Sequence, residues 1–380
     1  MSWTIALCLI PCLFSLIGAA IIYSKGRRGN TVQKLLASAL LTLGVGMMYV
    51  CIFQIPTHQT FYWLDWLLCT DAMIVPPLFF LYICHLTGTS SPEARLFAFI
   101  PAVIVSLGNC ILYLIMGDSV AQQYFQQVTT TGSLGADPSS LYVIKRIFGS
   151  YLYRAVILVP TVVFILMSIN KVKEYHRNVE DFLANADEKY FRADNTILWT
   201  FVIFVIVAIV YSLFPYSTYK NNPLYLIVMA AVTGAAVSLI TFYGIKQTYS
   251  AEDLEKMRHD NAETGIRNIS RNELSERIYQ LESGGFFYNP DITAASLADE
   301  LGTTPDHVVE LLKKEYSASF SGFVNEKRIK EAVVLMRNVP VSTPLTKIAI
   351  KVGYQAYPTF AKYFEMFMHV TPSEWMRKYR

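Results

Sequence analysis

Few residues of this sequence have the types and spacing that catalytic chemistry requires. Nothing resembling a phosphate-binding loop, an HExxH zinc-protease motif, a GxSxG nucleophile or paired metal-ligand cysteines appears in the 380 residues. All six cysteines fall within apolar runs of the first 110 residues, which is typical of small buried hydrophobic side chains rather than disulfide or metal ligands. The sequence therefore predicts a protein that is not an enzyme and that uses no cofactor or metal.

One acidic residue stands well inside an apolar segment. Asp71 lies about ten residues into a stretch long enough to cross a bilayer, and Pro76-Pro77, which must disturb a helix, follows it. Because ionisable groups are costly in hydrocarbon, Asp71 is a candidate for sensing a signal. The alternative is a structural acid that bonds to a neighbouring helix. Asp65 and Arg154 lie nearer segment ends, where their side chains can reach the interface.

The composition changes abruptly along the chain. The sequence is 53% hydrophobic and 16% charged, below the norm of about a quarter charged for soluble proteins. Residues 1–245 hold 14 Lys+Arg and 11 Asp+Glu, and the last 135 residues hold 18 of each. The pattern predicts a membrane domain over 1–245, a connector over 246–270 and a soluble domain over 271–380.

The first part contains seven apolar segments of about 20 residues, the length that a transmembrane helix needs. Ten lysines and arginines lie in connections one, three and five, against three in connections two, four and six. This bias predicts an all-α bundle of seven transmembrane helices with its N-terminus outside and its C-terminus in the cytoplasm. The predicted spans are 3–24, 34–54, 61–86, 96–117, 148–170, 196–215 and 223–244.

Two connections between the spans carry apolar residues. The outside connection 118–147 holds Tyr124, Phe125 and Tyr142 and is either a ligand lid or a passive loop. The inside connection 171–195 has an apolar stripe at helical spacing, which predicts a helix that continues the fifth span. That helix either packs against the sixth span or docks the soluble domain. The stripe consists of Val172, Tyr175, Val179, Phe182 and Leu183.

The soluble part contains two short helices around a glycine turn. Thr293 can cap a first helix that ends at Gly302, and Thr304 or Thr303 can cap a second helix that begins at Pro305. Two such helices with their apolar residues facing inward form a helix-turn-helix.

About fifty residues later the same pattern recurs. The second copy turns at Gly353, and its second helix starts near Pro358. The apolar helix between the two copies spans about 28 Å at 1.5 Å per residue, which approaches one turn of B-DNA. Two recognition helices at this spacing can enter successive major grooves on one face of DNA.

Residues 271–380 resemble the double helix-turn-helix domain of the AraC/XylS family of bacterial transcription regulators. The matching segments are SLADELGTTPDHVVELLKKE, NEKRIKEAVVLM, IAIKVGYQAYPTFAKYFEMF and VTPSEWMRKYR. Seven-span proteins that end in this domain look like a known arrangement in Bacteroidetes-type bacteria. The resemblance implies a place in the bacterial cytoplasmic membrane and sequence-specific binding to double-stranded promoter DNA as a homodimer. It adds RNA polymerase as a candidate partner beside the lipid bilayer.

Helical periodicity selects the side chains that should face DNA. In the first recognition helix Val308, Leu311 and Leu312 face inward, so the intervening polar residues face outward. Glu310 suits the amino group of cytosine, and Lys362 in the second unit suits guanine. Lys313, Lys314, Lys327 and Arg328 are predicted to position phosphates. The whole predicted set is Thr304, Asp306, His307, Glu310, Lys313, Lys314, Lys327, Arg328, Tyr357, Thr359 and Lys362.

Several positions depart from the family pattern. Glu310 stands where the family often has Arg, Glu365-Met366 replaces a basic pair, and His369 stands where Gly is common. From residue 271 onward 14 Lys+Arg balance 13 Asp+Glu, so the affinity for phosphate should be modest. The predicted function is a membrane-embedded one-component transcription regulator, which perceives a small-molecule or envelope signal. The alternative is a membrane receptor or transporter whose helical tail recruits protein.

Overall fold

The computed structural model describes residues 3–25, 31–53, 62–89, 98–131, 139–184, 192–212, 223–246, 271–340 and 342–379, and all regular elements within them are helices. The chain divides into two compact units. The first unit comprises Met1–Val172 and Ala193–Thr248, and the second comprises Lys173–Arg192 and Tyr249–Arg380. The predicted inside connection therefore groups with the C-terminal unit. The predicted connector 246–270 lies, apart from its first residue, outside the described residues.

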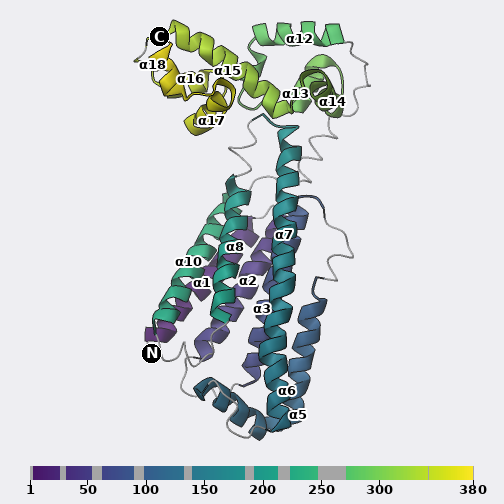
Figure 1. The fold of residues 1–380 in the computed structure, drawn as a ribbon, viewed down its shortest axis with the longest axis vertical. Helices are drawn as coiled ribbons and strands as arrows, with labels where there is room; N and C mark the ends of the chain where they lie inside the picture. Colours follow the sequence, from purple (N-terminus) through teal and green to yellow (C-terminus); the bar gives the residue numbers. More distant parts are fainter. Residues whose placement is uncertain are drawn as a thin grey trace. The chain divides into compact units, whose positions relative to one another are not determined.

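The first unit is a bundle of long helices (Figure 1). Its helices are α1 (Trp3–Lys25), α2 (Thr31–Phe53), α3 (Trp63–Leu86), α5 (Ile100–Thr131), α6 (Ser140–Arg146), the π-helix η2 (Ile147–Leu152), α7 (Tyr153–Glu180), α8 (Arg192–Ser212) and α10 (Pro223–Lys246). The last residues of α7, from Lys173 on, belong to the second unit. The helix α2 packs against both α1 and α3, while α10 packs against α1 and α5 packs against α3. A central apolar core joins α1, α2, α3, α8 and α10, with Tyr82 and Ile83 of α3 fully buried.

The long helices have the composition of membrane spans. Six of them are long and apolar enough to cross a bilayer, and α1 contributes a shorter apolar stretch, Leu9–Ser24. Large apolar side chains such as Ile104 and Leu114 are exposed on the outside of the bundle. Exposed apolar faces of this extent are expected where the surrounding solvent is lipid. The helices therefore indicate a membrane protein, and each predicted apolar segment contains a long helix.

The predicted outside connection 118–147 is wrong as a loop. The helix α5 continues to Thr131 through a kink at Gly117, whose φ is +70°. Glycine adopts this left-handed conformation without steric cost, so a second helical stretch can start at the kink. Tyr124 and Phe125 are buried, and residues 140–146 form α6. The described parts of this connection are thus packed helices rather than a loop.

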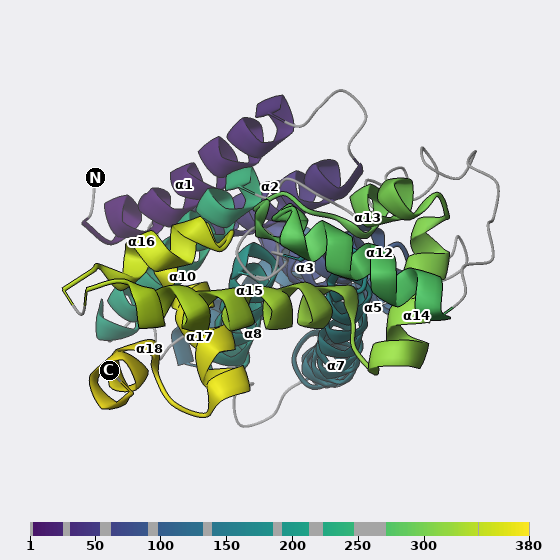
Figure 2. The same cartoon turned by 90° about the horizontal axis from the view of Figure 1, so that it is seen from above.

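The second unit is built around the helix α15 (Phe320–Asn338). Figure 2 shows one group of helices near each end of α15. The first group is α12 (Arg271–Ser283), the short 3-10 helix η4 (Phe286–Tyr288), α13 (Ala294–Leu301) and α14 (Pro305–Tyr316); the second is α16 (Leu345–Lys351), α17 (Tyr357–Met368) and α18 (Pro372–Lys378). The helix α15 gives Phe320 and Phe323 to one apolar core and Ile329 and Met336 to the other.

The predicted helix signals of the second unit are confirmed. The Thr293 side chain caps α13 in a capping box with Ser296, and the Thr304 side chain caps α14. Gly302 and Gly353 end the first helix of each copy with φ values of +67° and +94°. A side chain at Gly353 would place its Cβ 2.5 Å from the carbonyl oxygen of Tyr288, so glycine is required there.

Candidate nucleic-acid interface

The first recognition helix, α14, has one buried face and one polar face. Val308 and Leu312 are almost fully buried, and Val309 adds to this face beyond the prediction. Asp306, Glu310 and Lys313 are exposed, as their helical positions predicted, and Lys314 is exposed as well. The exposed residues follow Thr304, whose hydroxyl accepts a hydrogen bond from the backbone N–H of His307 at 3.4 Å. A polar face that starts at a capped N-terminus is the geometry with which a recognition helix reads base edges.

His307 sits between the two faces of α14. Its side chain is half-buried, and its Nε2 is buried with no hydrogen-bond partner among the described residues. A buried polar atom without a partner is costly. The half-buried imidazole of His307 therefore lies at the edge of the polar face of α14 rather than at its centre.

The second recognition helix, α17, lies in the second group of helices. Phe360, Tyr363 and Phe364 are buried against α15 and α18. Lys362 is exposed, and its Nζ lies 5.3 Å from the ring centre of Tyr363. Tyr357 and Thr359 are half-buried at the start of the helix. The outward position predicted for Lys362 is confirmed, and the other two side chains are accessible only in part.

Arg328 is not available to a phosphate, which corrects the prediction. Its side chain is fully buried, and its guanidinium donates from Nε to the carbonyl oxygen of Phe287 and from a terminal nitrogen to that of Asn289, each at 2.8 Å. Arg328 therefore joins α15 to the segment around η4. The sequence predicted an exposed charge at Arg328 because it does not reveal which face of α15 packs against η4.

Lys327 has a similar structural role. Its Nζ donates to a carboxylate oxygen of Glu282 in α12 at 2.6 Å, and the lysine side chain is only 17% exposed. The phosphate contacts predicted in this region therefore reduce to Lys313 and Lys314 of α14, both of which are exposed.

Lys313 is paired within the second unit by a residue far away in the sequence. Its Nζ donates to Asp181 Oδ2 at 2.6 Å; the Lys313 side chain is 54% exposed and that of Asp181 12%. Asp181 directly follows α7, which continues the fifth apolar segment as predicted but ends at Glu180, before Phe182 and Leu183 of the predicted stripe. No sequence signal marks this pair, because 132 positions separate its members.

The residues after Asp181 dock on the first helix-turn-helix. The backbone N–H of Ala294 donates to the carbonyl oxygen of Phe182 at 2.8 Å, and Leu183 forms an isolated β-bridge with Thr293. The carbonyl oxygen of Ala184 accepts hydrogen bonds from Ser321 Oγ at 3.1 Å and from Asn325 Nδ2 at 3.2 Å. We call residues 181–184 the docking segment. The docking alternative for the inside connection is thus confirmed for these residues, while Val172 packs in the core of the first unit.

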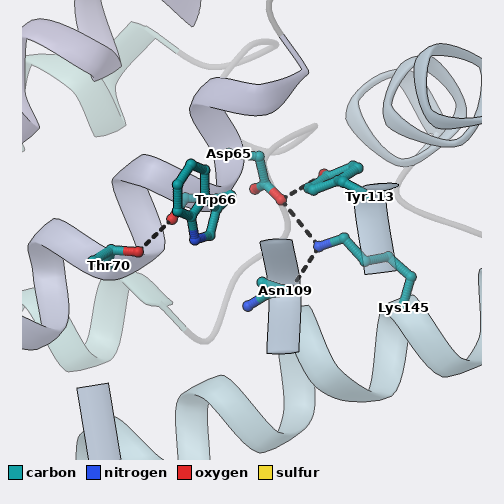
Figure 3. Close-up of polar contacts among 6 residues, drawn as sticks. All are labelled: Asp65, Trp66, Thr70, Asn109, Tyr113 and Lys145. Atoms are coloured by element: carbon teal, nitrogen blue, oxygen red, sulfur yellow. Dashed lines mark hydrogen bonds and ion pairs between the residues drawn. The ribbon is translucent and has the colours of Figure 1, made fainter. Parts of the chain in front are cut away.

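The acidic residues of α3 differ in their surroundings. Figure 3 shows Asp65 between the Tyr113 hydroxyl, which donates to it at 2.7 Å, and the Lys145 ammonium at 3.4 Å. Lys145 is 1% exposed and also donates to Asn109 Oδ1 at 2.8 Å. Asp65 therefore joins α3 to α5 and α6, rather than merely extending to an interface.

Asp71 lies six residues, about 1.7 turns, further along α3. It forms no hydrogen bond or ion pair with the described residues, and it lies in the wall of a cavity in the first unit. The carboxyl group approaches α2 at Gly46, where a Cβ atom would collide with Asp71 Oδ2. The structural-acid alternative predicts a bond to a neighbouring helix, and the described part of α2 provides none.

Residues 297–378 match a family model described as a helix-turn-helix domain. The matched range includes both recognition helices and supports the assignment of the C-terminal region as an AraC-type DNA-binding domain, which is not a catalytic domain. Comparisons with curated proteins and with solved structures gave no match. The chain thus combines a domain for binding double-stranded DNA with a bundle of long apolar helices.

Proposed function

We propose that the protein is a one-component transcription regulator embedded in the bacterial cytoplasmic membrane. Residues 1–245 form a seven-span sensor domain with its N-terminus outside, residues 246–270 a connector, and residues 271–380 bind promoter DNA in the cytoplasm as a homodimer. A signal perceived in the membrane shifts an equilibrium between states of different DNA affinity. Asp71 is the proposed signal-sensing residue.

The docking segment is the observation that carries this proposal. It follows α7, the continuation of an apolar helix, and it contacts both helices of the first helix-turn-helix through Thr293, Ala294 and Lys313. A shift of α7 would therefore reach the recognition helix directly. Because Lys313 can bind either Asp181 or a DNA phosphate, the ion pair competes with DNA. This competition supports control of DNA binding from the membrane domain.

The polar faces of the two recognition helices define the proposed DNA site. Glu310 accepts from the amino group of cytosine, and Lys362 donates to guanine. The site therefore contains a cytosine and a guanine about 10 base pairs apart. Because Arg328 and Lys327 bind other groups within the protein, few lysine and arginine side chains remain to contact DNA phosphates. One DNA-binding domain alone binds DNA weakly, and its affinity falls as the salt concentration rises. Two tethered domains bind DNA more tightly than one.

Selection of random duplex DNA by the full-length protein in lipid nanodiscs tests this function. The expected result is enrichment of one motif with the cytosine and guanine at the stated spacing, recovered at low salt and lost at high salt. A Glu310→Ala protein should enrich a motif that is relaxed at the cytosine only, and Glu315→Ala, in the same helix, is the matched control. Recovery of no motif by a folded protein would favour the receptor or transporter whose tail recruits protein.

Reporter fusions test the proposed orientation. Alkaline phosphatase, which is active only outside the cytoplasm, should be active when fused after residues 57, 130 and 220. It should be inactive after residues 30, 180 and 380. Activity after Arg380 would contradict the whole proposal, because a DNA-binding domain outside the cytoplasm has no promoter to bind.

A further inference from the structure

The first unit contains a cavity of about 200 Å³ between its helices. Four helices, α2, α3, α7 and α8, supply nearly all of the wall, and Met229 of α10 completes it. A cavity of roughly 150 Å³ accepts benzene, so this one has room for about one aromatic ring with a short side chain. The apolar wall includes Met47, Val50, Leu68, Val75, Phe204 and Ile209.

Three side chains bring oxygen atoms to this apolar wall. They are the carboxyl group of Asp71 and the hydroxyl groups of Tyr153 and Thr161. Among the described residues, the lining contains no Lys or Arg and Asp71 forms no ion pair. The ionised form of a carboxyl group in such a site needs a cation beside it, because without one the group takes up a proton. The ligand is therefore expected to bring the cation.

A proline inside α3 adds an acceptor near the carboxyl group. Pro76 has no backbone N–H, so the carbonyl oxygen of Ala72, four residues earlier, loses its helical donor. Ala72 and Pro76 both line the cavity, and Ala72 directly follows Asp71. An ammonium group has three donors and no acceptor, which matches a site that offers acceptors. The rings of Tyr153 and Phe204 add faces that attract a cation.

We propose that this cavity binds a small apolar molecule that carries a protonated amine, about the size of an arylalkylamine. The ammonium group pairs with Asp71, and the ring fills the apolar part of the cavity. A neutral alcohol of the same shape leaves the carboxylate without a cation, and a carboxylic acid repels it. That the amine is the regulatory signal rests on the proposed function, whereas the binding itself does not.

Binding is measured with the full-length protein in lipid nanodiscs, without DNA, by calorimetry and by the shift in unfolding temperature. The probes are 2-phenylethylamine, 2-phenylethanol and phenylacetate, which share a ring and chain length and differ in the terminal group. We expect the amine to bind at least 10-fold more tightly than the alcohol, and phenylacetate to give no shift. Equal affinity for amine and alcohol, or no binding of the amine, would overturn the proposal.

Two variants locate the site. Asp71→Asn should reduce amine affinity at least 10-fold and leave alcohol affinity unchanged. Asp118→Asn is the matched control, because Asp118 accepts a hydrogen bond from Tyr62 and does not line the cavity. Ala208→Phe fills the cavity while Asp71 remains, and it should abolish amine binding; Ile206→Phe, at an exposed position of the same helix outside the lining, should not. Unchanged amine affinity in folded Asp71→Asn or Ala208→Phe protein would place the amine elsewhere.

The same nanodisc protein separates this inference from the proposed function. If the protein selects a DNA motif and does not bind the amine, the ligand assignment fails and the regulator remains. If it binds the amine through Asp71 and selects no DNA motif, the ligand assignment of the cavity stands and the proposed function as a transcription regulator is wrong. If both hold, the amine should change the affinity for the selected duplex in the parent protein and not in Asp71→Asn.

Discussion

The two helix-turn-helix copies of the C-terminal unit share one architecture but differ in what contacts them. The first copy is contacted by the docking segment at the start of α13, through a backbone hydrogen bond, and near the end of α14, through the Lys313–Asp181 ion pair. The described contact between the second copy and the docking segment is indirect. The Tyr363 hydroxyl of α17 lies 3.3 Å from Ser321 Oγ, which in turn donates a hydrogen bond to the carbonyl oxygen of Ala184.

This difference suggests a division of work. We propose that the docking segment changes the access of the first copy to DNA and leaves that of the second copy unchanged. A regulator built in this way stays near its site through one copy and adjusts its affinity through the other. The following predictions can break or sharpen this comparison.

The largest effect is expected at Arg328, which both copies depend on. Arg328→Ala removes the donor to the buried carbonyl oxygen of Phe287 and one donor to the carbonyl oxygen of Asn289, together with a guanidinium 5.4 Å from the ring centre of Tyr354. We expect the free energy of unfolding of the C-terminal unit to fall by about 3 kcal/mol. Chemical denaturation measures it, and Lys314→Ala, at an exposed lysine, is the control that should not change stability.

The second-largest effect concerns the copy without direct contact to the docking segment. Lys362→Ala should weaken binding to the selected duplex by about 2 kcal/mol and relax the preference for guanine. The loss should be the same for the full-length protein and for an isolated fragment 271–380, because the contact described between the docking segment and α17 runs only through Ser321. Fluorescence anisotropy measures both. A loss confined to the full-length protein would break the comparison.

Glu310→Ala tests base reading by the first copy. It should reduce discrimination at the cytosine position by about 1 kcal/mol, since one carboxylate contact is lost. Competition between duplexes that differ at this base measures the change. An unchanged preference in a folded protein would show that Glu310 is only a solvated residue on the exposed face of α14.

The smallest effect is expected for Asp181→Asn. Lys313 is 54% exposed, so its pair with Asp181 is worth less than about 1 kcal/mol. Release of Lys313 should raise DNA affinity about twofold to fivefold in the full-length protein. Asp299→Asn, at an exposed acid of α13, removes the same charge and should have no such effect. Lower affinity in Asp181→Asn would show that the pair positions the recognition helix instead of competing with DNA.

The sequence predicted the C-terminal fold well because the signals there are local. Thr293, Gly302 and Thr304 act on residues within one helical turn, and the structure confirms each of them. Apolar length alone likewise located the long helices. The continuation of α5 past Gly117 was missed, because a glycine at a polar boundary marks a loop as readily as a kink.

The site was less predictable because burial depends on distant partners. The charges of Arg328 and Lys327 suggested phosphates, yet carbonyl groups near η4 and Glu282 hold them. Lys145 was counted as an outside charge, although it is buried beside Asp65, 80 positions away. Helical periodicity gives the exposed face of α14 but cannot show which other segment covers part of it.

The length of α15 has a consequence for how such a regulator could change its target. The helix has 19 residues, and each residue adds 1.5 Å and a rotation of about 100°. One inserted residue would turn the second copy to another side of the duplex and abolish simultaneous binding. Seven inserted residues would restore the facing to within about 20° and add about 10 Å, close to three base pairs. Operator spacing in descendants of this protein is therefore expected to change in steps rather than continuously.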